Sequence, residues 1–273
     1  MKNYNKKILI IGGSGFLGSN LFFFLKENYN VCIGIKPGKN LLKENSKLNL
    51  IEIDLYNEKS LLSALSNFDT VINSAGANSD ICNSDIVCGI NSNITLRALI
   101  GKAAIKSGVE RIINFSTAHV YGKLEGSIDE NMKPFNINPY AFLHLAGELT
   151  LKNVVLNTNT KLINMRLGNI FGFPKLKNDH CWKLFTNDLC KQAILNKKMI
   201  IKNNYLQERN FLGIKDFCEI VEFFINCPRN KILFDTYNIG SKSSMSLKSM
   251  ATLIQKQISK ELNFYPEIVY ESE

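Results

Sequence analysis

The fold is decided near the start of the chain by the stretch Lys7-Ile8-Leu9-Ile10-Ile11-Gly12-Gly13-Ser14-Gly15-Phe16-Leu17-Gly18. The apolar run Ile8–Ile11 predicts a buried strand, and the glycines after it predict a tight turn that opens into a helix. Glycine lets the backbone of such a turn approach a phosphate group, and the free N–H groups of the next helix bind its charge. We therefore expect a phosphate-binding loop between residues 12 and 18.

Outward from this loop, short apolar runs alternate with longer helical patterns as far as residue 166. The predicted strands are Lys7–Ile11, Val31–Ile35, Leu50–Ile53, Thr70–Ile72, Arg111–Phe115 and Lys161–Arg166. The predicted helices are Phe16–Glu27, Glu58–Ser66, Ile94–Lys106 and Pro139–Leu156. This alternation predicts an α/β fold, a Rossmann-type doubly wound parallel sheet with helices on both faces.

The alternation of apolar runs and helical patterns becomes less regular after residue 166, which indicates a second, smaller region. Helices are expected near Trp182–Leu195, Lys215–Asn226 and Leu247–Ser259, with loops and short strands between them. We interpret residues 1–166 as a dinucleotide-binding domain, and residues 167–273 as a smaller C-terminal substrate-binding lobe that partly returns to the sheet. Ligands of open α/β sheets bind at the carboxyl ends of the strands, where this lobe is expected to close.

The composition is that of an ordinary globular protein, with 45% hydrophobic and 21% charged residues in a chain of 273. No apolar run approaches the roughly 18–20 residues that cross a bilayer. The N-terminus shows no cleavage site, so we expect a cytoplasmic protein without a membrane partner. The seven cysteines show no metal-ligand spacing and are expected to be reduced thiols, with no metal site. The net charge of +9 comes from scattered lysines, which does not favour a nucleic-acid partner.

The glycine loop predicts a bound dinucleotide, because it lies between an apolar strand and an amphipathic helix. The residues expected against the pyrophosphate are Gly12, Gly15, Phe16, Leu17 and Gly18. An acid at the end of the second strand would bind the ribose hydroxyls of NAD. Ile35 stands there instead, followed by Lys36 and Lys39, so we expect NADP. NAD stays the alternative if both lysines are solvated loop charges.

Two further motifs, Ser116-Thr117-Ala118-His119-Val120-Tyr121-Gly122 and Asn138-Pro139-Tyr140, follow the glycine loop. With them, the chain resembles the extended short-chain dehydrogenases/reductases from Ile8 to about Gly240. That family contains NAD(P)-dependent nucleotide-sugar epimerases, dehydratases and 4-keto reductases. The resemblance implies a nucleotide-sugar substrate and a place in polysaccharide biosynthesis.

The resemblance also implies a role for each matching residue. Cofactor contacts fall on the residues after the third and fourth strands and on an active-site asparagine, which are Asp54, Leu55, Ala75, Gly76, Ala77 and Asn93. Thr117 would polarise the substrate oxygen, and Tyr140 would be the catalytic acid or base. Asn169 would touch the sugar nucleotide. Arg209 would grip its diphosphate or, alternatively, form an ordinary surface salt bridge.

The chain departs from its family one helical turn after Tyr140, where His144 replaces the lysine of the Tyr-x-x-x-Lys motif. In the family that lysine binds the nicotinamide ribose and lowers the pKa of the tyrosine by its charge. His144 is expected to contact both the cofactor and the reacting groups, either as a neutral ribose anchor or as a cation. We favour the neutral anchor, for which turnover rises above pH 8 and His144→Lys raises turnover at neutral pH.

The loop after the fifth predicted strand helps to distinguish which reaction of the family is expected. Dehydratases of the family carry Asp-Glu directly after the threonine, whereas this chain has Ala118 and His119. Without that acid–base pair, 4,6-dehydration is disfavoured. His119 is a candidate substrate contact, as an acid or base, or else a cap at the end of the strand.

The expected function is an NAD(P)-dependent reductase or epimerase of a nucleotide-diphosphate sugar. Three alternatives stay open: an inactive dinucleotide-sensing protein, an RNA-binding relative of the fold, and a short-chain enzyme with a non-nucleotide substrate. The resemblance and the apolar residues around Ile94–Lys106 and Pro139–Leu156 predict a homodimer built partly from these helices.

Overall fold

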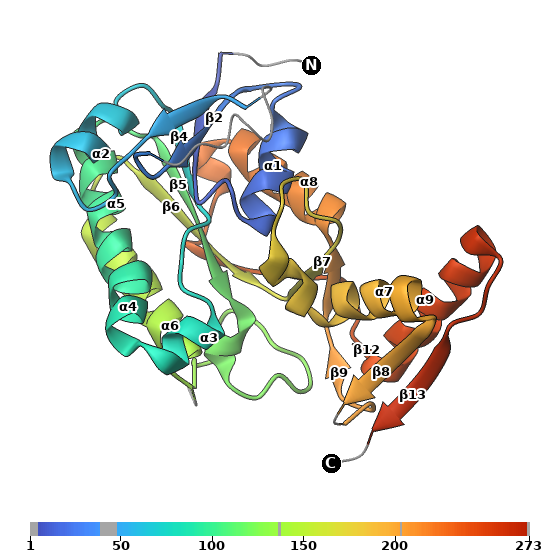
Figure 1. Ribbon diagram of the computed structural model, residues 1–273. Coiled ribbons are helices and arrows are strands. Elements are labelled where there is room, and N and C mark those ends of the chain that lie inside the picture. The colour runs from blue at the N-terminus through green and yellow to red at the C-terminus, as the bar shows by residue number, and fades with distance from the viewer. Residues whose placement is uncertain (1–4, 39–47, 136–137, 203, 272–273) are drawn as a thin grey trace. The chain divides into compact units, whose positions relative to one another are not determined.

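The computed structural model describes residues 5–38, 48–135, 138–202 and 204–271 (Figure 1). The chain forms two compact units. The first unit comprises Met1–Leu167 and Cys218–Ile239, and the second comprises Gly168–Phe217 and Gly240–Glu273. The chain therefore leaves the first unit after Leu167 and returns to it at Cys218, a segment whose bounds the sequence did not indicate.

The first unit contains a parallel sheet of seven strands in the order β11-β6-β5-β4-β1-β2-β3. These strands are β1 (Lys7–Ile11), β2 (Asn30–Ile35), β3 (Leu50–Glu52), β4 (Thr70–Asn73), β5 (Arg111–Thr117), β6 (Lys161–Leu167) and β11 (Thr236–Ile239). The strand order reverses beside β1, because β2 and β4 lie on its opposite sides. The predicted doubly wound sheet is confirmed. In open sheets of this kind, ligands are expected at the carboxyl ends of the strands where the order reverses, which are β1 and β4 here.

Helices cover both faces of this sheet (Figure 1). The first unit's helices include α1 (Phe16–Leu25), α2 (Glu58–Leu65), α3 (Ser79–Ser84), α4 (Ile86–Ile90), α5 (Leu96–Lys106) and α6 (Pro139–Val155). The helices α2, α5 and α6 pack in succession on one face, over the apolar residues of β1, β4 and β5. On the other face, α1 lies beside α8 (Ile214–Asn226), which enters this unit at Cys218.

Local sequence explains where the helices that carry the site begin. Asn138 caps α6 by accepting a hydrogen bond from the backbone N–H of Ala141 at 2.9 Å, and Pro139 fits the first turn. The start of α5 differs from the prediction of one regular helix over Ile94–Lys106. A π-helical turn, η1 (Asn91–Thr95), comes directly before Leu96. Such turns are rare and displace backbone carbonyls from the regular ladder.

The second unit has its own core, formed by α7 (Phe185–Asn196), α9 (Leu247–Leu262) and short strands. The strands pair as β7 (Asn169–Phe171) with β10 (Phe211–Gly213), β8 (Lys198–Lys202) with β13 (Glu267–Glu271), and β9 (Glu208–Arg209) with β12 (Met245–Ser246). The first two pairs are parallel and the third is antiparallel. The described residues also form 3-10 helices, which are η3 (Asp179–Lys183) in the second unit and η2 (Ala118–Tyr121) and η4 (Arg229–Lys231) in the first.

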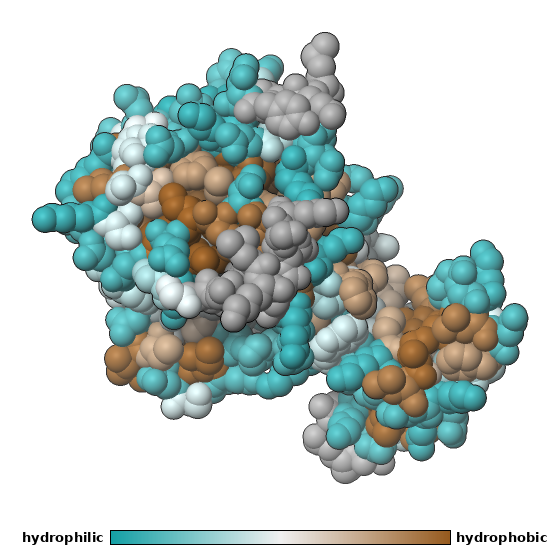
Figure 2. All heavy atoms as spheres, turned by 45° about the horizontal axis from the view of Figure 1, so that its top comes forward, coloured by the Kyte–Doolittle hydropathy of each residue, from teal (hydrophilic) through white to brown (hydrophobic). Residues whose placement is uncertain are grey.

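Apolar side chains also reach the surface of both units, among broad hydrophilic areas (Figure 2). Exposed examples are Phe223 and Leu233 in the first unit and Leu253 and Leu262 in the second. Within the described ranges, no helix combines the length and the apolar character that a membrane span requires.

Candidate active site

The glycine loop between β1 and α1 is shaped by close backbone contacts. Gly12 has φ +79°, and a Cβ there would lie 2.6 Å from the backbone nitrogen of Ala75. A Cβ at Gly18 would lie 2.6 Å from the carbonyl oxygen of Gly12. Packing alone therefore demands glycine at both positions. At Gly15 a Cβ would meet one neighbour, the Gly12 carbonyl oxygen at 3.2 Å, so this position has the most room for a ligand.

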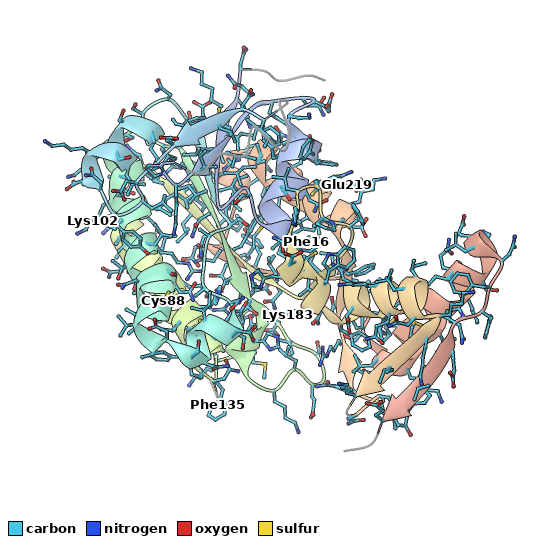
Figure 3. The ribbon with its side chains drawn as sticks, viewed as in Figure 1. Phe16, Cys88, Lys102, Phe135, Lys183 and Glu219 are labelled. Atoms are coloured by element: carbon cyan, nitrogen blue, oxygen red, sulfur yellow. The ribbon has the colours of Figure 1, made fainter. Side chains whose placement is uncertain are left out.

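The first turn of α1 continues the cradle. Gly15 is the N-cap, and no side chain caps the helix, which begins at Phe16 (Figure 3). The amide groups of Phe16 and Leu17 therefore lie at a helix end whose dipole favours an anion. The residues present fit the pyrophosphate of a dinucleotide, since glycines make the backbone accessible and no acidic side chain occupies this turn.

The loop after β4 is fixed by a buried asparagine. Asn93 accepts a hydrogen bond from the Ala77 backbone N–H at 3.1 Å and donates to the Ala77 carbonyl at 3.3 Å. Ala75 donates its N–H to Asn73 at 3.3 Å, and a Cβ at Gly76 would collide with Asn93 Oδ1. The structure therefore brings the predicted residues 75–77 and Asn93 together, beside the glycine loop.

Thr117, Tyr140 and His144 meet at the carboxyl end of β5. The rings of Tyr140 and His144 are 4.6 Å apart, and the His119 ring lies 6.3 Å from that of Tyr140. Thr117 accepts from the His119 backbone N–H at 3.2 Å, which leaves its own hydroxyl proton to donate. Burial raises the pKa of Tyr140, while a hydrogen bond from Thr117 and the charge of Arg97 oppose the rise.

Arg97 is the residue of this cluster that the motifs did not indicate. It is fully buried on α5, and its Nη2 lies 3.1 Å from His144 Nδ1. The sequence held one signal, because Arg97 falls on the apolar stripe of a predicted helix together with Ile100 and Ala104. A charged residue on such a stripe is rarely buried without a partner, and so indicates a polar site beneath the helix.

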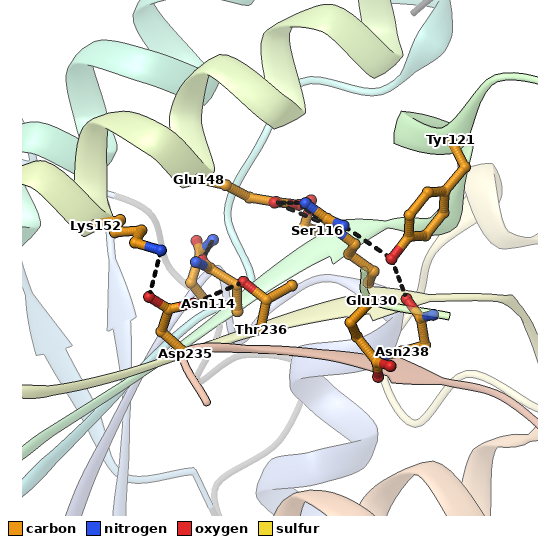
Figure 4. Close-up of polar contacts among 11 residues, drawn as sticks. Asn114, Ser116, Tyr121, Glu130, Glu148, Lys152, Asp235, Thr236 and Asn238 are labelled. Atoms are coloured by element: carbon orange, nitrogen blue, oxygen red, sulfur yellow. Dashed lines mark hydrogen bonds and ion pairs between the residues drawn. The ribbon is translucent and has the colours of Figure 1, made fainter. Parts of the chain in front are cut away.

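A second polar network includes Ser116, the residue that precedes Thr117 on β5 (Figure 4). Glu148 forms an ion pair with Arg166 at 2.8 Å and accepts a hydrogen bond from Ser116. Arg166 donates to the Tyr121 hydroxyl at 2.8 Å, and that hydroxyl donates to Asn238 on β11. This network fixes the strand end and the turn that carry Thr117 and His119.

The residues predicted to discriminate the cofactor lie around the ends of β2 and β3. Lys36 is exposed after Ile35, and Lys39 lies outside the described residues. Glu52 is in register with Ile35, and its carboxylate accepts from the backbone N–H of Gly38 at 3.4 Å. Asp54 and Leu55 follow β3 in the loop that leads to α2.

Asn169 and Arg209 belong to the second unit, where the pairing of β7 with β10 brings their segments together. Asn169 donates through its side chain to the Asn210 carbonyl at 3.0 Å. Arg209 contacts Gln207 at 3.1 Å and lies over the ring of Phe185, and burial lowers its pKa. No carboxylate in the described part of the chain forms an ion pair with Arg209.

Comparison with known proteins identifies the family. Residues 8–240 match the NAD dependent epimerase/dehydratase family. The chain is 26% identical over 270 residues to a Bacillus subtilis protein named Uncharacterized UDP-glucose epimerase YtcB, a match that covers 91% of this chain and 81% of that protein. It is 27% identical over 277 residues to the dTDP-D-glucose 4,6-dehydratase of Mus musculus, over 96% of this chain and 75% of the relative.

Among solved structures, the UDP-glucuronic acid 4-epimerase from Bacillus cereus in complex with NAD superposes with a TM-score of 0.80. The sequence identity is 24%, and the superposition covers 97% of this chain and 85% of that one. That likeness shows the fold, whereas the sequence match over residues 8–240 shows the ancestry. It confirms the resemblance drawn from the motifs: the chain belongs to the NAD dependent epimerase/dehydratase family.

Proposed function

We propose that this protein is an NAD(P)-dependent oxidoreductase of a nucleotide-diphosphate sugar, and that it reduces a keto group or epimerises a carbinol carbon. One observation carries the proposal. A threonine hydroxyl, the Tyr140 phenol and the His144 ring meet at the end of β5, in the same unit as a glycine cradle that fits a pyrophosphate. A nicotinamide dinucleotide bound there would supply hydride donation or acceptance.

The chain's own residues supply the proton chemistry and the orientation. Tyr140 gives a proton to the substrate oxygen or takes one from it, and Thr117 donates a hydrogen bond that polarises the same oxygen. His144 holds the nicotinamide ribose. The partial exposure of Tyr140 is what this role requires, because the phenol has to reach a ligand from within a buried cluster.

Arg209 and Asn169 would hold the nucleotide part of the substrate. A guanidinium without a carboxylate partner suits the diphosphate, which offers paired anionic oxygens in a matching geometry. Dehydration is a disfavoured outcome despite the mouse relative, because Ala118 and His119 supply no acidic side chain for the expulsion of water. His119 would contact the sugar, a role supported by the 6.3 Å distance between its ring and that of Tyr140.

The decisive experiment combines binding and turnover. A panel of nucleotide sugars is tested with NADPH and NADH, first by thermal shift, where a true ligand raises the Tm, and then by turnover. We expect Tyr140→Phe to abolish turnover and to leave dinucleotide affinity nearly unchanged. Retained activity in Tyr140→Phe would contradict the proposed chemistry. Tight dinucleotide binding without turnover of any sugar would contradict the enzymatic function and favour a dinucleotide-sensing protein.

The preference for NADP(H) stays a prediction. Lys36 favours a 2′-phosphate, whereas Glu52, beside Ile35, offers a carboxylate for the ribose hydroxyls of NAD. Direct titration separates the two influences. Lys36→Glu is expected to weaken NADPH binding much more than NADH binding, and Glu52→Gln to have the opposite selectivity. Equal or tighter binding of NADH by the native protein would refute the preference.

We also propose a homodimer formed partly by α5 and α6. On α6, Phe142 and Leu149 are 54% and 57% exposed, and their spacing of two helical turns places them on one face. Light scattering at micromolar concentration is expected to give a dimer, and Leu149→Asp a monomer with an unchanged fold. A monomeric native protein would refute this assembly.

A further inference from the structure

Helix α5 carries a cation that is held entirely inside the protein. Arg97 is 0% exposed, in contrast with Lys102 on the same helix, which is exposed to solvent (Figure 3). Arg97 Nε donates to Asn114 Oδ1 at 2.9 Å, Nη2 donates to the Phe115 carbonyl at 3.1 Å, and Nη1 donates to the Asn93 carbonyl. All three acceptors are neutral, and the carboxylate of Glu148, which forms its ion pair with Arg166, favours the charged form of Arg97 by its negative charge.

Helix α6 leaves space for this guanidinium. A Cβ at Gly147 would lie 2.4 Å from Arg97 Nη1 and 2.1 Å from the Asn93 carbonyl oxygen. Gly147 comes one turn after His144 on the same face of α6. The absence of a side chain there lets Arg97 reach under the helix to the histidine.

The contact between Arg97 and His144 determines where the histidine carries its proton. Arg97 Nη2 lies 3.1 Å from His144 Nδ1. An arginine side chain offers only hydrogen-bond donors, so Nδ1 has to be the acceptor. The ring is then neutral and carries its proton on Nε2. Burial, and secondly the charge of Arg97, lower the pKa of His144 well below 6.5, in agreement with this state.

We propose that Arg97 is a positioning residue which, together with His144, replaces the lysine of the family's Tyr-x-x-x-Lys motif. Arg97 supplies the positive charge near Tyr140 and holds His144 in the Nε2–H form, and Nε2–H is the donor for the ribose hydroxyl. One lysine would perform both tasks, and this chain divides them between two helices. The inference rests on the proposed function, because it assigns a ribose contact to His144.

The surroundings of Tyr140 support the assignment of the charge. Its titratable neighbours are Arg97 on α5, Cys82 on α3, His119 on η2 and His144 on its own helix. Burial lowers the pKa of Arg97 to about 10, so Arg97 is still a cation at neutral pH. Burial raises the pKa of Cys82, which therefore stays a thiol. Arg97 thus favours the phenolate of Tyr140 against the effect of burial.

This arrangement reverses the expectation for His144→Lys that follows from the motif alone. A lysine at this position would place an ammonium group beside a buried guanidinium, and like charges at such a distance repel strongly. We therefore expect His144→Lys to lower dinucleotide affinity or turnover by about tenfold or more. Replacing both residues, with Arg97→Met and His144→Lys together, is expected to recover most of the loss, since one cation remains.

The first experiment is a double-mutant cycle of Arg97→Met and His144→Lys, with Lys102→Met as the control that removes a cation from the exposed side of α5. Dinucleotide affinity, Tm and the pH profile of turnover are measured for each protein. The alkaline limb of the pH profile is the change of turnover that follows the ionisation of Tyr140. In Arg97→Met this limb should move up by about one pH unit, because the charge that favours the phenolate is gone. Lys102→Met should match the native protein. Additive effects in the cycle, or an unmoved limb, would overturn the proposal.

Arg97→Lys is the reserve variant if Arg97→Met does not fold, because it keeps the charge but loses the fork that reaches His144. It is expected to keep the alkaline limb within about half a pH unit of native and to lose part of the dinucleotide affinity. If the alkaline limb of Arg97→Lys moves as far as expected for Arg97→Met, the proposal that the charge of Arg97 acts on Tyr140 is contradicted.

The second experiment does not depend on turnover. The chain has three histidines, and 15N-labelled imidazole signals can be assigned with His119→Gln and His180→Gln. We expect His144 to be neutral with its proton on Nε2 from pH 7.5 down to pH 5.5. A proton on Nδ1, or a charged ring at neutral pH, would overturn the proposal. If the Nε2–H form is observed but no sugar is turned over, the proposed function fails while the Arg97–His144 arrangement stands.

Discussion

Arg97 and Arg166 lie in the same unit and are both buried, at 0% and 7% exposure, but their surroundings differ. Arg166 pairs with the carboxylate of Glu148, whereas Arg97 is bound by two backbone carbonyls, an asparagine oxygen and a histidine nitrogen. Burial lowers the pKa of both, but bonds with Glu148 and Tyr121 more than offset this for Arg166. A buried ion pair largely cancels its own charge, whereas Arg97, which forms no ion pair within the described residues, acts by its charge on Tyr140 and His144.

The largest effect is expected when Arg166 is made to resemble Arg97. Glu148→Gln removes the carboxylate and leaves a buried guanidinium without a counter-charge, which costs about 3–5 kcal/mol of unfolding free energy. Urea unfolding measures this. A loss below about 1 kcal/mol would show that Arg166 does not need its partner, and the contrast between the arginines would disappear.

A smaller effect is expected from filling the space that Arg97 occupies. Gly147→Ala places a methyl group against the backbone and the guanidinium, and should cost about 1–3 kcal/mol while disturbing His144. The matched control is Gly101→Ala on α5, whose Cβ would lie nearest to side-chain atoms of Leu151 and Val154 and not to backbone. If Gly101→Ala is the more harmful of the two by thermal unfolding, Arg97 is not tightly held.

The third prediction concerns acid, which should act on the Arg97 side of the comparison. Folded His144 stays neutral below pH 6.5, whereas in the unfolded chain it takes up a proton near that pH. The unfolded state then binds more protons, so stability falls as the pH drops below about 6.5, by up to about 1.4 kcal/mol per pH unit. Urea unfolding between pH 7.5 and 5.5 should show a shallower slope for His144→Gln and the native slope for the exposed His180→Gln. Equal slopes in all three proteins would refute the neutral ring.

The smallest effect should come from an ion pair that is exposed to water. Lys152 on α6 lies 2.8 Å from Asp235, and the two side chains are 54% and 36% exposed (Figure 4). Lys152→Met is expected to change the unfolding free energy by less than about 1 kcal/mol, because solvent screens such pairs. A cost comparable to that of Glu148→Gln would mean that burial does not set the strength of these pairs.

Six of the seven strands were predictable because each contains a short run of apolar residues, and the first turn because it needs glycine. The seventh strand, β11, was not predicted. The spacing of Tyr140 and His144 by one helical turn could also be predicted from the sequence. The pairing between segments distant in sequence could not be predicted. Arg97 contacts Asn114 and His144, which are distant from it in sequence, so no local pattern predicts these contacts. The helices α3 and α4, of six and five residues, are too short to show a periodicity.

The second unit was harder to predict for a related reason. Its strands are two to five residues long, and each pairs with a segment distant in sequence, as β8 does with β13. Runs that short carry too few alternations to distinguish a strand from a loop. Asn169 and Arg209 were found through motifs, and their shared neighbourhood follows from the pairing of β7 with β10.

The asparagine that receives Arg97 has a consequence for how the sheet assembles. Asn73, Asn114 and Asn164 lie side by side on β4, β5 and β6, and each amide donates to the next at 2.9 and 2.8 Å. Sliding β4 or β6 along β5 by two residues would keep every side chain on its face but separate these amides, because Asn73 or Asn164 would then lie opposite Ile112 or Ser116 instead of Asn114. Each unpaired group would cost about 1–3 kcal/mol. The three carboxamides thus specify the register of strands whose apolar residues alone would permit several registers.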